Sequence, residues 1–179
     1  MLSTADEDGV QVVLVQNAAK ARVMGAELEV TAAPAPRLLL SASAGLIDAE
    51  FTDVAAGAAI TTASHFASTP KFSSSVSAEY GVPLGDWGTL TLRGDYSYRS
   101  RIYYEVNNLP AVTQNGYGLL NLQATLEPED GRYALILAMT NVADKRYKST
   151  AVSTLDSLGF ASAQYGRPRE WSLTARVRF

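Results

Sequence analysis

The stretch that decides the fold is Arg167-Pro-Arg-Glu-Trp-Ser-Leu-Thr-Ala-Arg-Val-Arg-Phe179. Counting back from Phe179, every second residue to Trp171 is apolar, and every residue between them is polar. This period of two predicts a β-strand with one apolar and one wet face. A final aromatic residue and arginines on the wet face are typical of an outer-membrane barrel, which has lipid outside and water or a polar plug inside. A soluble β-sandwich can also contain such a strand, so this segment alone leaves both architectures open.

Composition places the chain among ordered proteins of single-domain length. It has 179 residues, of which 47% are hydrophobic, and a net charge of −3, which excludes a disordered chain. No apolar run approaches the ~20 residues that a membrane-spanning helix needs, so helical spans are excluded. A mean hydropathy of −0.01 is compatible with a membrane barrel, because inward polar residues offset outward apolar ones. The absence of cysteine excludes disulfides and thiolate metal sites.

Six further segments alternate in the same way: residues 22–31, 37–51, 71–82, 89–99, 117–126 and 132–139. In the clearest of them, Leu90, Leu92 and Tyr96 oppose Thr91 and Arg93. Several segments reach about ten residues, more than is usual in soluble sheets and enough for a tilted strand to cross a bilayer. Segment 132–139 is apolar on both faces, so its orientation stays open.

The connections between these segments alternate in length. Residues 33–36, 83–88 and 127–131 are short and rich in Pro, Gly and Asp, as tight turns require. Residues 52–69, 105–115 and 141–166 are long. Short turns at one end and long loops at the other are typical of outer-membrane barrels, whose long loops are extracellular. A chain of seven such strands that starts on the side of the long loops ends on the opposite, periplasmic side.

Several motifs resemble those of TonB-dependent receptors and follow the order of that family. They are Asn17–Glu29, with Gly-x-Glu-x-Glu at its end, Leu38–Phe51, Pro70–Ser73, Asn141–Tyr147 and Gly166–Arg169. The fourth is similar to the family's Asn-Leu-x-Asp-x-x-Tyr segment, and the fifth to its Gly-x-Pro-Arg before the last strand. Val142 and Ala143 depart from the commoner Leu-Phe pair.

The resemblance implies an all-β fold, an antiparallel transmembrane β-barrel in the cell outer membrane of a Gram-negative bacterium. Residues 1–179 would form about seven C-terminal strands of a 22-strand barrel, without the N-terminal plug domain that contacts TonB. The implied function is gated uptake of a scarce small-molecule ligand, such as an iron–siderophore complex, a cobalamin or a saccharide. We expect no covalent chemistry and no cofactor. Because Met1–Gly9 lacks the pattern of a secretory signal, we expect an exported protein to start further upstream.

Candidate ligand contacts are the tyrosines that flank the expected outer loops, where a ligand would first arrive: Tyr103, Tyr104, Tyr117, Tyr147 and Tyr165. Basic residues border the last loop and provide a field for an anionic ligand or for lipopolysaccharide phosphate: Lys145, Arg146, Lys148, Arg167 and Arg169. The other aromatic residues near strand ends, including Tyr80 and Trp171, fit interfacial girdles.

Charged residues on the wet strand faces are predicted to form an ion-pair lattice inside a barrel, not a hydrolytic site. The set comprises Glu27, Glu29, Glu79, Arg93, Asp95 and Arg99. The lone His65 is expected in a surface loop, because a metal site needs convergent ligands. With this single histidine no Ser-His-Asp set is expected. We therefore predict no catalytic and no metal-binding residue.

The last strand carries a second expectation from the resemblance. Phe179, Val177 and Leu173 fit the C-terminal signal that the barrel-assembly machinery reads; the alternative is that Phe179 is only an interfacial anchor. Membrane lipid and lipopolysaccharide are expected around the barrel, and TonB only through the missing plug. A pI near 5.2 without a basic stripe argues against nucleic-acid binding.

Two alternatives remain open at this point. One is a small self-contained outer-membrane barrel of eight strands that acts as an adhesin or pore, and the other is a soluble β-sandwich binding module. The upstream DNA separates them: a plug and further strands support the receptor, and a nearby signal peptide supports the small barrel.

Overall fold

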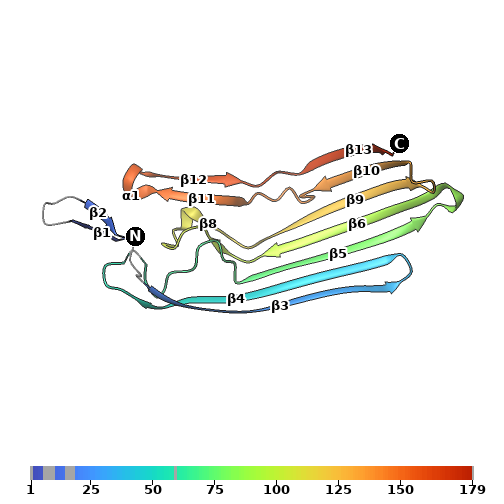
Figure 1. Ribbon diagram of the computed structural model, residues 1–179. Coiled ribbons are helices and arrows are strands. Elements are labelled where there is room, and N and C mark those ends of the chain that lie inside the picture. Colours follow the sequence, from blue (N-terminus) through green and yellow to red (C-terminus); the bar gives the residue numbers. More distant parts are fainter. Residues whose placement is uncertain (1, 6–10, 15–18, 59, 179) are drawn as a thin grey trace.

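The computed structural model describes residues 2–5, 11–14, 19–58 and 60–178, which are almost entirely β-structure (Figure 1). Its main sheet has seven antiparallel strands: β3 (Ala19–Ala35), β4 (Leu38–Val54), β5 (Phe72–Pro83), β6 (Gly88–Arg99), β9 (Tyr117–Pro128), β10 (Tyr133–Thr140) and β13 (Glu170–Val177). Each strand pairs with the next in this order, so all seven predicted strands are confirmed. A separate hairpin consists of β1 (Leu2–Ala5) and β2 (Gln11–Leu14). Among the described residues, no helix is long and apolar enough to cross a bilayer.

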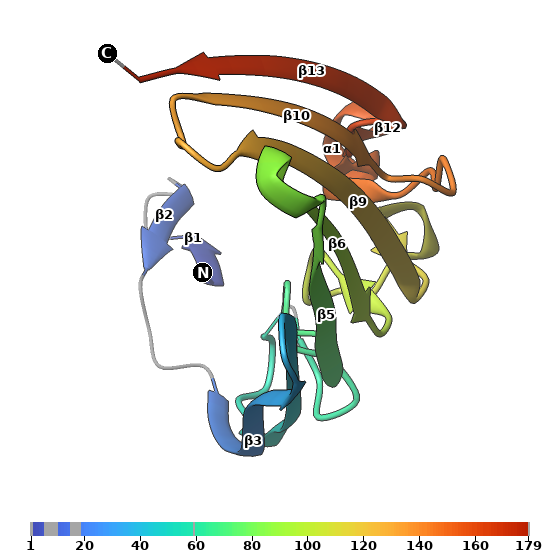
Figure 2. The same ribbon diagram turned by 90° about the vertical axis from the view of Figure 1, so that its right-hand side faces the viewer.

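The sheet curves strongly and forms part of a barrel wall with one hollow and one outer face (Figure 2). The strand register brings residues of like polarity into line across it. One apolar row runs through Leu38, Tyr80, Leu92, Ala124, Leu137 and Leu173. A polar row on the opposite face runs through Thr31, Ser41, Ser77, Asp95 and Asn121. Because side chains alternate along a strand, seven aligned strands sum to one apolar and one polar surface.

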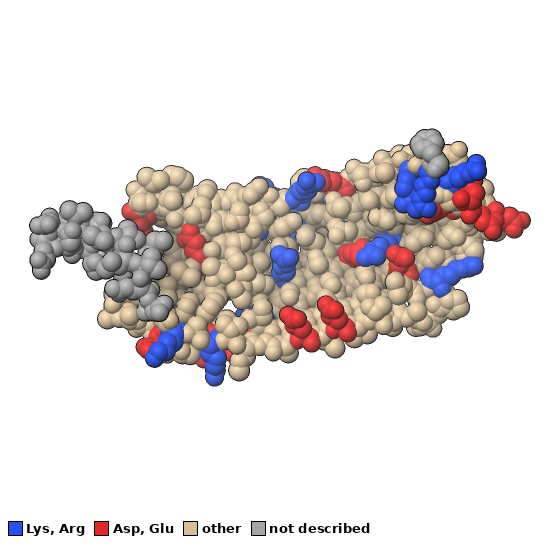
Figure 3. All heavy atoms as spheres, viewed as in Figure 1, with Lys and Arg blue, Asp and Glu red and all other residues tan. Residues whose placement is uncertain are grey.

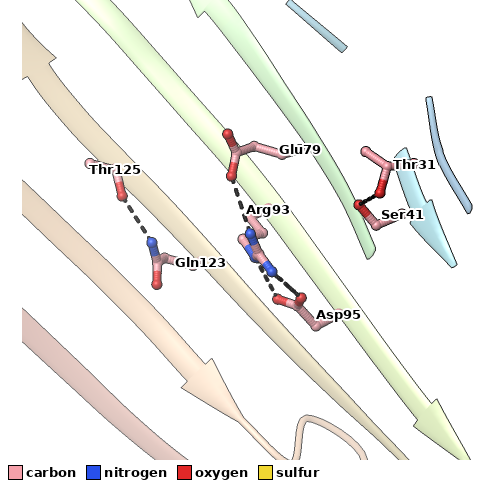
Figure 4. A network of polar contacts seen from close by, with 7 residues as sticks. All are labelled: Thr31, Ser41, Glu79, Arg93, Asp95, Gln123 and Thr125. Atoms are coloured by element: carbon pink, nitrogen blue, oxygen red, sulfur yellow. Dashed lines mark hydrogen bonds and ion pairs between the residues drawn. The ribbon is translucent and has the colours of Figure 1, made fainter. Parts of the chain in front are cut away.

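The polar surface is the concave one. Figure 3 shows lysine, arginine, aspartate and glutamate side chains on the face seen in Figure 1, which is the hollow side in Figure 2. Arg93 lies 2.7 Å from Asp95 and 3.4 Å from Glu79 (Figure 4). This confirms the inward ion-pair lattice for these three residues. The ion pairs between described residues include neither Glu27 nor Glu29.

The orientation of β10, which its own sequence left open, follows from its neighbours. Leu137 pairs with Ala124 on one side and Leu173 on the other, so it belongs to the apolar row. Ile136 pairs with Thr125 and Thr174 and therefore lies on the concave face. An apolar residue is tolerated there, whereas a polar residue in the outward row would meet lipid. The outward set is thus Leu135, Leu137 and Met139.

The three short turns lie together at one end of the sheet and the three long connections at the other, as predicted (Figure 1). The first turn is shorter than residues 33–36, because β3 continues to Ala35 and only Pro36 and Arg37 lie outside the strands. Arg37 takes a positive φ of 64°. Pro34 lies where the β3–β4 register shifts, a position that tolerates its missing N–H. The pair of prolines therefore marked a bulge as well as a turn.

The long connections contain more structure than their sequences indicate. The segment between β6 and β9 begins at Ser100, earlier than the predicted residue 105, and holds β7 (Ile102–Tyr103), a 3-10 turn η2 (Pro110–Val112) and β8 (Thr113–Gln114). The last connection holds β11 (Lys148–Thr154), α1 (Leu155–Leu158) and β12 (Phe160–Tyr165), not one long loop. The last strand starts at Glu170, so Arg167–Arg169 precede it. Buried Ile102, Val112 and Ala151 give these outer segments a small core of their own.

We expect the isolated 179-residue chain not to be a stable, water-soluble monomer. In the described structure β3 pairs only with β4 and β13 only with β10, so each keeps one open edge, which promotes aggregation. The outward row would also meet water instead of lipid: the exposed fraction of Leu173 is 67% and that of Trp171 is 64%. Analytical ultracentrifugation without detergent tests this expectation, and a monodisperse monomer would contradict it.

Candidate ligand pocket at the long-loop end

Three of the five candidate tyrosines meet in one hollow at the long-loop end of the concave face. Tyr104, Tyr117 and Tyr147 come from three separate segments of the chain and line a cavity of about 360 Å³. The remaining lining residues are Ser68, Ser97, Arg99, Ile102, Leu119 and Ser149. Ser97 and Arg99 lie on the same face of β6 as Arg93, so the cavity continues the polar inner surface.

Tyr117 and Tyr147 form the aromatic wall of the pocket. Their rings stack with centroids 4.5 Å apart and planes inclined by 17°. Tyr117 begins β9 opposite Arg99 and is only 7% exposed. The Tyr147 ring lies over the backbone of Gly166, where an added Cβ would come within 2.0 Å of the ring. The close approach of the ring therefore requires glycine at position 166. The Gly166 N–H also donates a hydrogen bond to the Tyr147 carbonyl oxygen at 2.9 Å, which holds the two residues together.

Tyr104 reaches the pocket from the second long connection. Its hydroxyl donates a hydrogen bond to the Lys148 carbonyl oxygen in the third connection. Burial raises the pKa of the Tyr104 phenol above its ordinary value, with a smaller contribution from Tyr117. The phenol thus stays protonated at neutral pH and remains a hydrogen-bond donor.

Lys148 joins the second and third connections instead of contributing a free charge. Its ammonium group donates to the carbonyl oxygens of Ala111 at 2.6 Å and Thr113 at 3.0 Å. Its backbone N–H donates to Oε1 of Gln114 at 2.8 Å. Two neighbouring segments that line the pocket are thereby held together.

Three other basic residues of the last connection are also engaged locally, Lys145 is exposed, and none of the four lines the pocket. The Arg146 guanidinium lies 5.1 Å from the centroid of the Tyr165 ring. Arg167 pairs with Glu170 at 3.5 Å, and Arg169 donates to the Val142 carbonyl oxygen at 3.4 Å. Arg99, which we had assigned to the inward lattice, supplies the positive charge that lines the pocket.

Tyr103 and Tyr165 lie outside this pocket. Tyr103 stacks on His65 with ring centroids 4.4 Å apart, and both line a second hollow of about 320 Å³ beside Lys71 and Arg101. His65 is in the loop where we expected it, but it is half-buried and not a freely solvated surface residue. Tyr165 is exposed on β12.

The chemistry that the first pocket offers is stacking, hydrogen bonding and one positive charge. Within the described ranges, no three His, Cys, Asp or Glu side chains gather as a metal site would require. A larger hollow of about 510 Å³ lies on the opposite, apolar face, where Leu92, Leu137 and Trp171 line it. It lies on the outward surface, away from the concave face that carries the first pocket.

The proposed assembly residues can be placed only in part. Leu173 pairs with Leu137 and Val177 pairs with Tyr133, so both belong to the outward face. Phe179 lies outside the described residues.

Sequence reasoning missed Lys148 as a structural link and Gly166 as the seat of the Tyr147 ring. The Gly166–Arg169 motif already singled out Gly166 in the sequence. Nothing in the local sequence indicated that the aromatic ring packed against this glycine belongs to Tyr147.

The comparisons with known proteins agree with this geometry. A model of the TonB-dependent receptor-like β-barrel matches residues 2–142. The chain is similar to the ferric yersiniabactin uptake receptor FyuA of Yersinia pestis, with a TM-score of 0.74 and 22% identity over 91% of this chain and 24% of that one. It is also similar to BauA, the ferric preacinetobactin receptor of Acinetobacter baumannii, with a TM-score of 0.69 and 20% identity over 97% of this chain and 25% of that one.

A third solved structure, the ferric-catecholate import receptor Fiu of E. coli K12, has a TM-score of 0.69 and 18% identity over 99% of this chain and 23% of that one. No curated protein matches the sequence. The chain thus spans about a quarter of the length of these solved receptors, and at such identities the likeness shows the fold. Because the family model covers most of the sequence, the chain belongs to the TonB-dependent receptor-like β-barrel family of the outer membrane.

Proposed function

We propose that this chain is the C-terminal part of a substrate-gated outer-membrane transporter that takes up a ferric siderophore. Residues 1–179 would supply barrel wall, inner lining and three outer loops, and a plug domain encoded upstream would contact TonB. The observation that carries the proposal is the pocket of Tyr104, Tyr117, Tyr147 and Arg99, which opens on the concave face at the long-loop end. In the family's orientation this end is extracellular.

The lining of the pocket favours a flat, electron-rich, anionic ligand. The stacked Tyr117 and Tyr147 rings offer aromatic surface, and the Arg99 guanidinium is a hydrogen-bond donor. The Tyr104 phenol already donates its proton to the Lys148 carbonyl oxygen, so its oxygen can only accept from a ligand. A ferric complex with catecholate or phenolate groups combines these properties. A neutral saccharide would stack on the same rings but would leave the charge of Arg99 unused.

The remaining surfaces support further proposed partners. The outward apolar rows would contact membrane lipid and lipopolysaccharide, and the last strand would be read by the barrel-assembly machinery. The family is one of transport receptors, and the pocket is proposed to bind its ligand without covalent chemistry.

Replacing Arg99 by glutamine tests the pocket. Hydrogen bonds to charged groups contribute about 1.5–3 kcal/mol, so R99Q is expected to weaken binding of an anionic ferric siderophore roughly tenfold to a hundredfold. The measurement is equilibrium binding to the receptor expressed from its complete reading frame and purified in detergent. The ligand panel contains ferric catecholate and phenolate siderophores, cobalamin and a maltooligosaccharide.

The matched control is Tyr165→Ala, which removes an exposed rim tyrosine outside the pocket and should leave affinity unchanged. Failure of the unmodified receptor to bind any ferric siderophore would remove the proposed ligand class. Equal affinities of the unmodified receptor and R99Q would show that the ligand binds elsewhere.

A further inference from the structure

Asn141 is the one buried polar residue among the described side chains, with an exposed fraction of 4%. It follows β10 directly and starts the last outer connection. Its φ of 49° is in the left-handed region, which asparagine adopts more readily than most residues. Its backbone N–H donates to Oδ1 of Asn121 at 2.9 Å, which ties the start of the connection to the concave face of β9.

The Asn141 side chain then joins the two ends of the last connection. Its Nδ2 donates to the carbonyl oxygens of Lys145 and Arg167, both at 3.0 Å. Its Oδ1 accepts from the Lys145 N–H at 2.8 Å. Residues 145 and 167 are far apart in sequence, and one amide group with two donors and an acceptor satisfies backbone groups from both.

Asp144 and Gly166 reinforce the same junction. Oδ1 of Asp144 accepts from the Arg169 N–H at 3.0 Å, and the Asp144 N–H donates to the Asn141 carbonyl oxygen at 2.8 Å. Gly166 carries the Tyr147 ring. The Asn141–Tyr147 and Gly166–Arg169 segments, which are separate motifs in the sequence, therefore form one interlocked unit.

We propose that Asn141 is a positioning residue for ligand binding, which holds the base of the last connection so that Tyr147 stays against Tyr117 in the pocket. Only Tyr147 of this interlocked unit lines the pocket, and its ring is fixed by the Gly166 backbone on one side and the Tyr117 ring on the other. Loss of the Asn141 amide leaves two carbonyl groups and one N–H without their buried partner, which loosens the seat of the ring. The expected effect of Asn141 on ligand affinity rests on the proposed function, whereas its expected effect on the structure of the loop does not.

The test compares Asn141→Asp with Asn121→Asp in the receptor expressed from its complete reading frame. N141D keeps the size and the acceptor oxygen for Lys145 but replaces the two donors, so it should repel the Lys145 and Arg167 carbonyl groups. N121D makes the same amide-to-carboxylate change at the residue that is hydrogen-bonded to the Asn141 backbone. It keeps the oxygen that accepts the Asn141 N–H. Asn141→Gly, which suits the positive φ and removes the whole amide, is the second variant in case N141D does not assemble.

Hydrogen exchange of the ligand-free receptor is measured first. N141D and N141G should both exchange the amide protons of Gly166 and Arg169 faster, and N141G should also expose the Lys145 amide, which loses its acceptor oxygen. N121D should match the unmodified receptor. Unchanged protection of these amides in both Asn141 variants would overturn the inference, whatever the receptor binds.

Ferric siderophore affinity is then measured in two backgrounds, with surface levels as the check on assembly. In the unmodified background N141D should raise the dissociation constant about tenfold, and in the Tyr147→Leu background it should have little further effect, because contacting residues couple non-additively. Equal fold-changes in both backgrounds would show that Asn141 does not act through Tyr147. If the unmodified receptor binds no siderophore, the proposed function fails, and the exchange data alone decide whether Asn141 holds the loop.

Discussion

The Leu92→Arg substitution is expected to destabilise the receptor barrel in lipid by about 2–4 kcal/mol, the cost of an arginine near the bilayer midplane on the outward face. Leu92 lies near the middle of β6, 44% exposed, in the apolar row between Tyr80 and Ala124. A guanidinium there would have to leave the hydrocarbon or draw water into it. Urea unfolding of the receptor expressed from its complete reading frame, reconstituted in lipid vesicles, measures the change in the free energy of unfolding.

Thr91→Arg is the matched control, because it introduces the same side chain one residue away on the opposite face. Thr91 pairs with Thr125 and shares the concave face with Arg93, where water and the nearby Glu127 can accommodate a cation. Its effect should be much smaller than that of Leu92→Arg. Equal losses for the two variants would contradict the assignment of the inner and outer faces.

Deletion of Phe179 is expected to slow or abolish assembly of the receptor in cells while leaving the refolded protein nearly as stable. The expectation rests on the outward Leu173 and Val177, which precede Phe179 in an alternating last strand. If the assembly machinery reads this pattern, the loss is kinetic. Protein refolded directly into lipid should then lose at most the ~1.5–3 kcal/mol that burial of one aromatic side chain supplies.

Surface labelling in cells and urea unfolding after refolding separate the two readings of Phe179. Replacing Phe179 by tyrosine, which preserves a terminal aromatic residue, should restore surface levels. Normal surface levels of the deletion would leave Phe179 as an interfacial anchor and remove its role as a signal.

The barrel wall was accessible from sequence because its determinants are local. Period-two alternation identifies a strand and its two faces without reference to any partner, as in the run from Leu90 to Tyr96. Turns and loops are likewise marked by nearby Gly, Pro and Asp residues. The seven strands of the main sheet, their order and the two classes of connection therefore followed from short stretches of chain. The family match over residues 2–142 covers three of the motifs quoted from the sequence, Asn17–Glu29, Leu38–Phe51 and Pro70–Ser73.

The local sequence could not predict the environment of a residue whose type is compatible with two environments. The apolar residues of β10 suit either face, and only pairing with Ala124 and Leu173 places Leu137 outward. Pro34 is compatible with a turn or a bulge, and only the β3–β4 register shows a bulge. The β11–β12 hairpin lacks a strong apolar alternation because most of its side chains are exposed, so burial leaves little trace in its sequence.

For the candidate pocket, too, some features were predictable from the sequence and others were not. The sequence by itself determined that tyrosines flank the outer loops and that Asn141 and Gly166 open recognisable motifs. Only the tertiary structure decided that Tyr104, Tyr117 and Tyr147 share a cavity while Tyr103 and Tyr165 do not, and that Lys148 is bonded to carbonyl groups instead of facing a ligand. Ring stacking and hydrogen bonds between distant loops depend on how the strands align those loops, and a local period carries no information about that alignment.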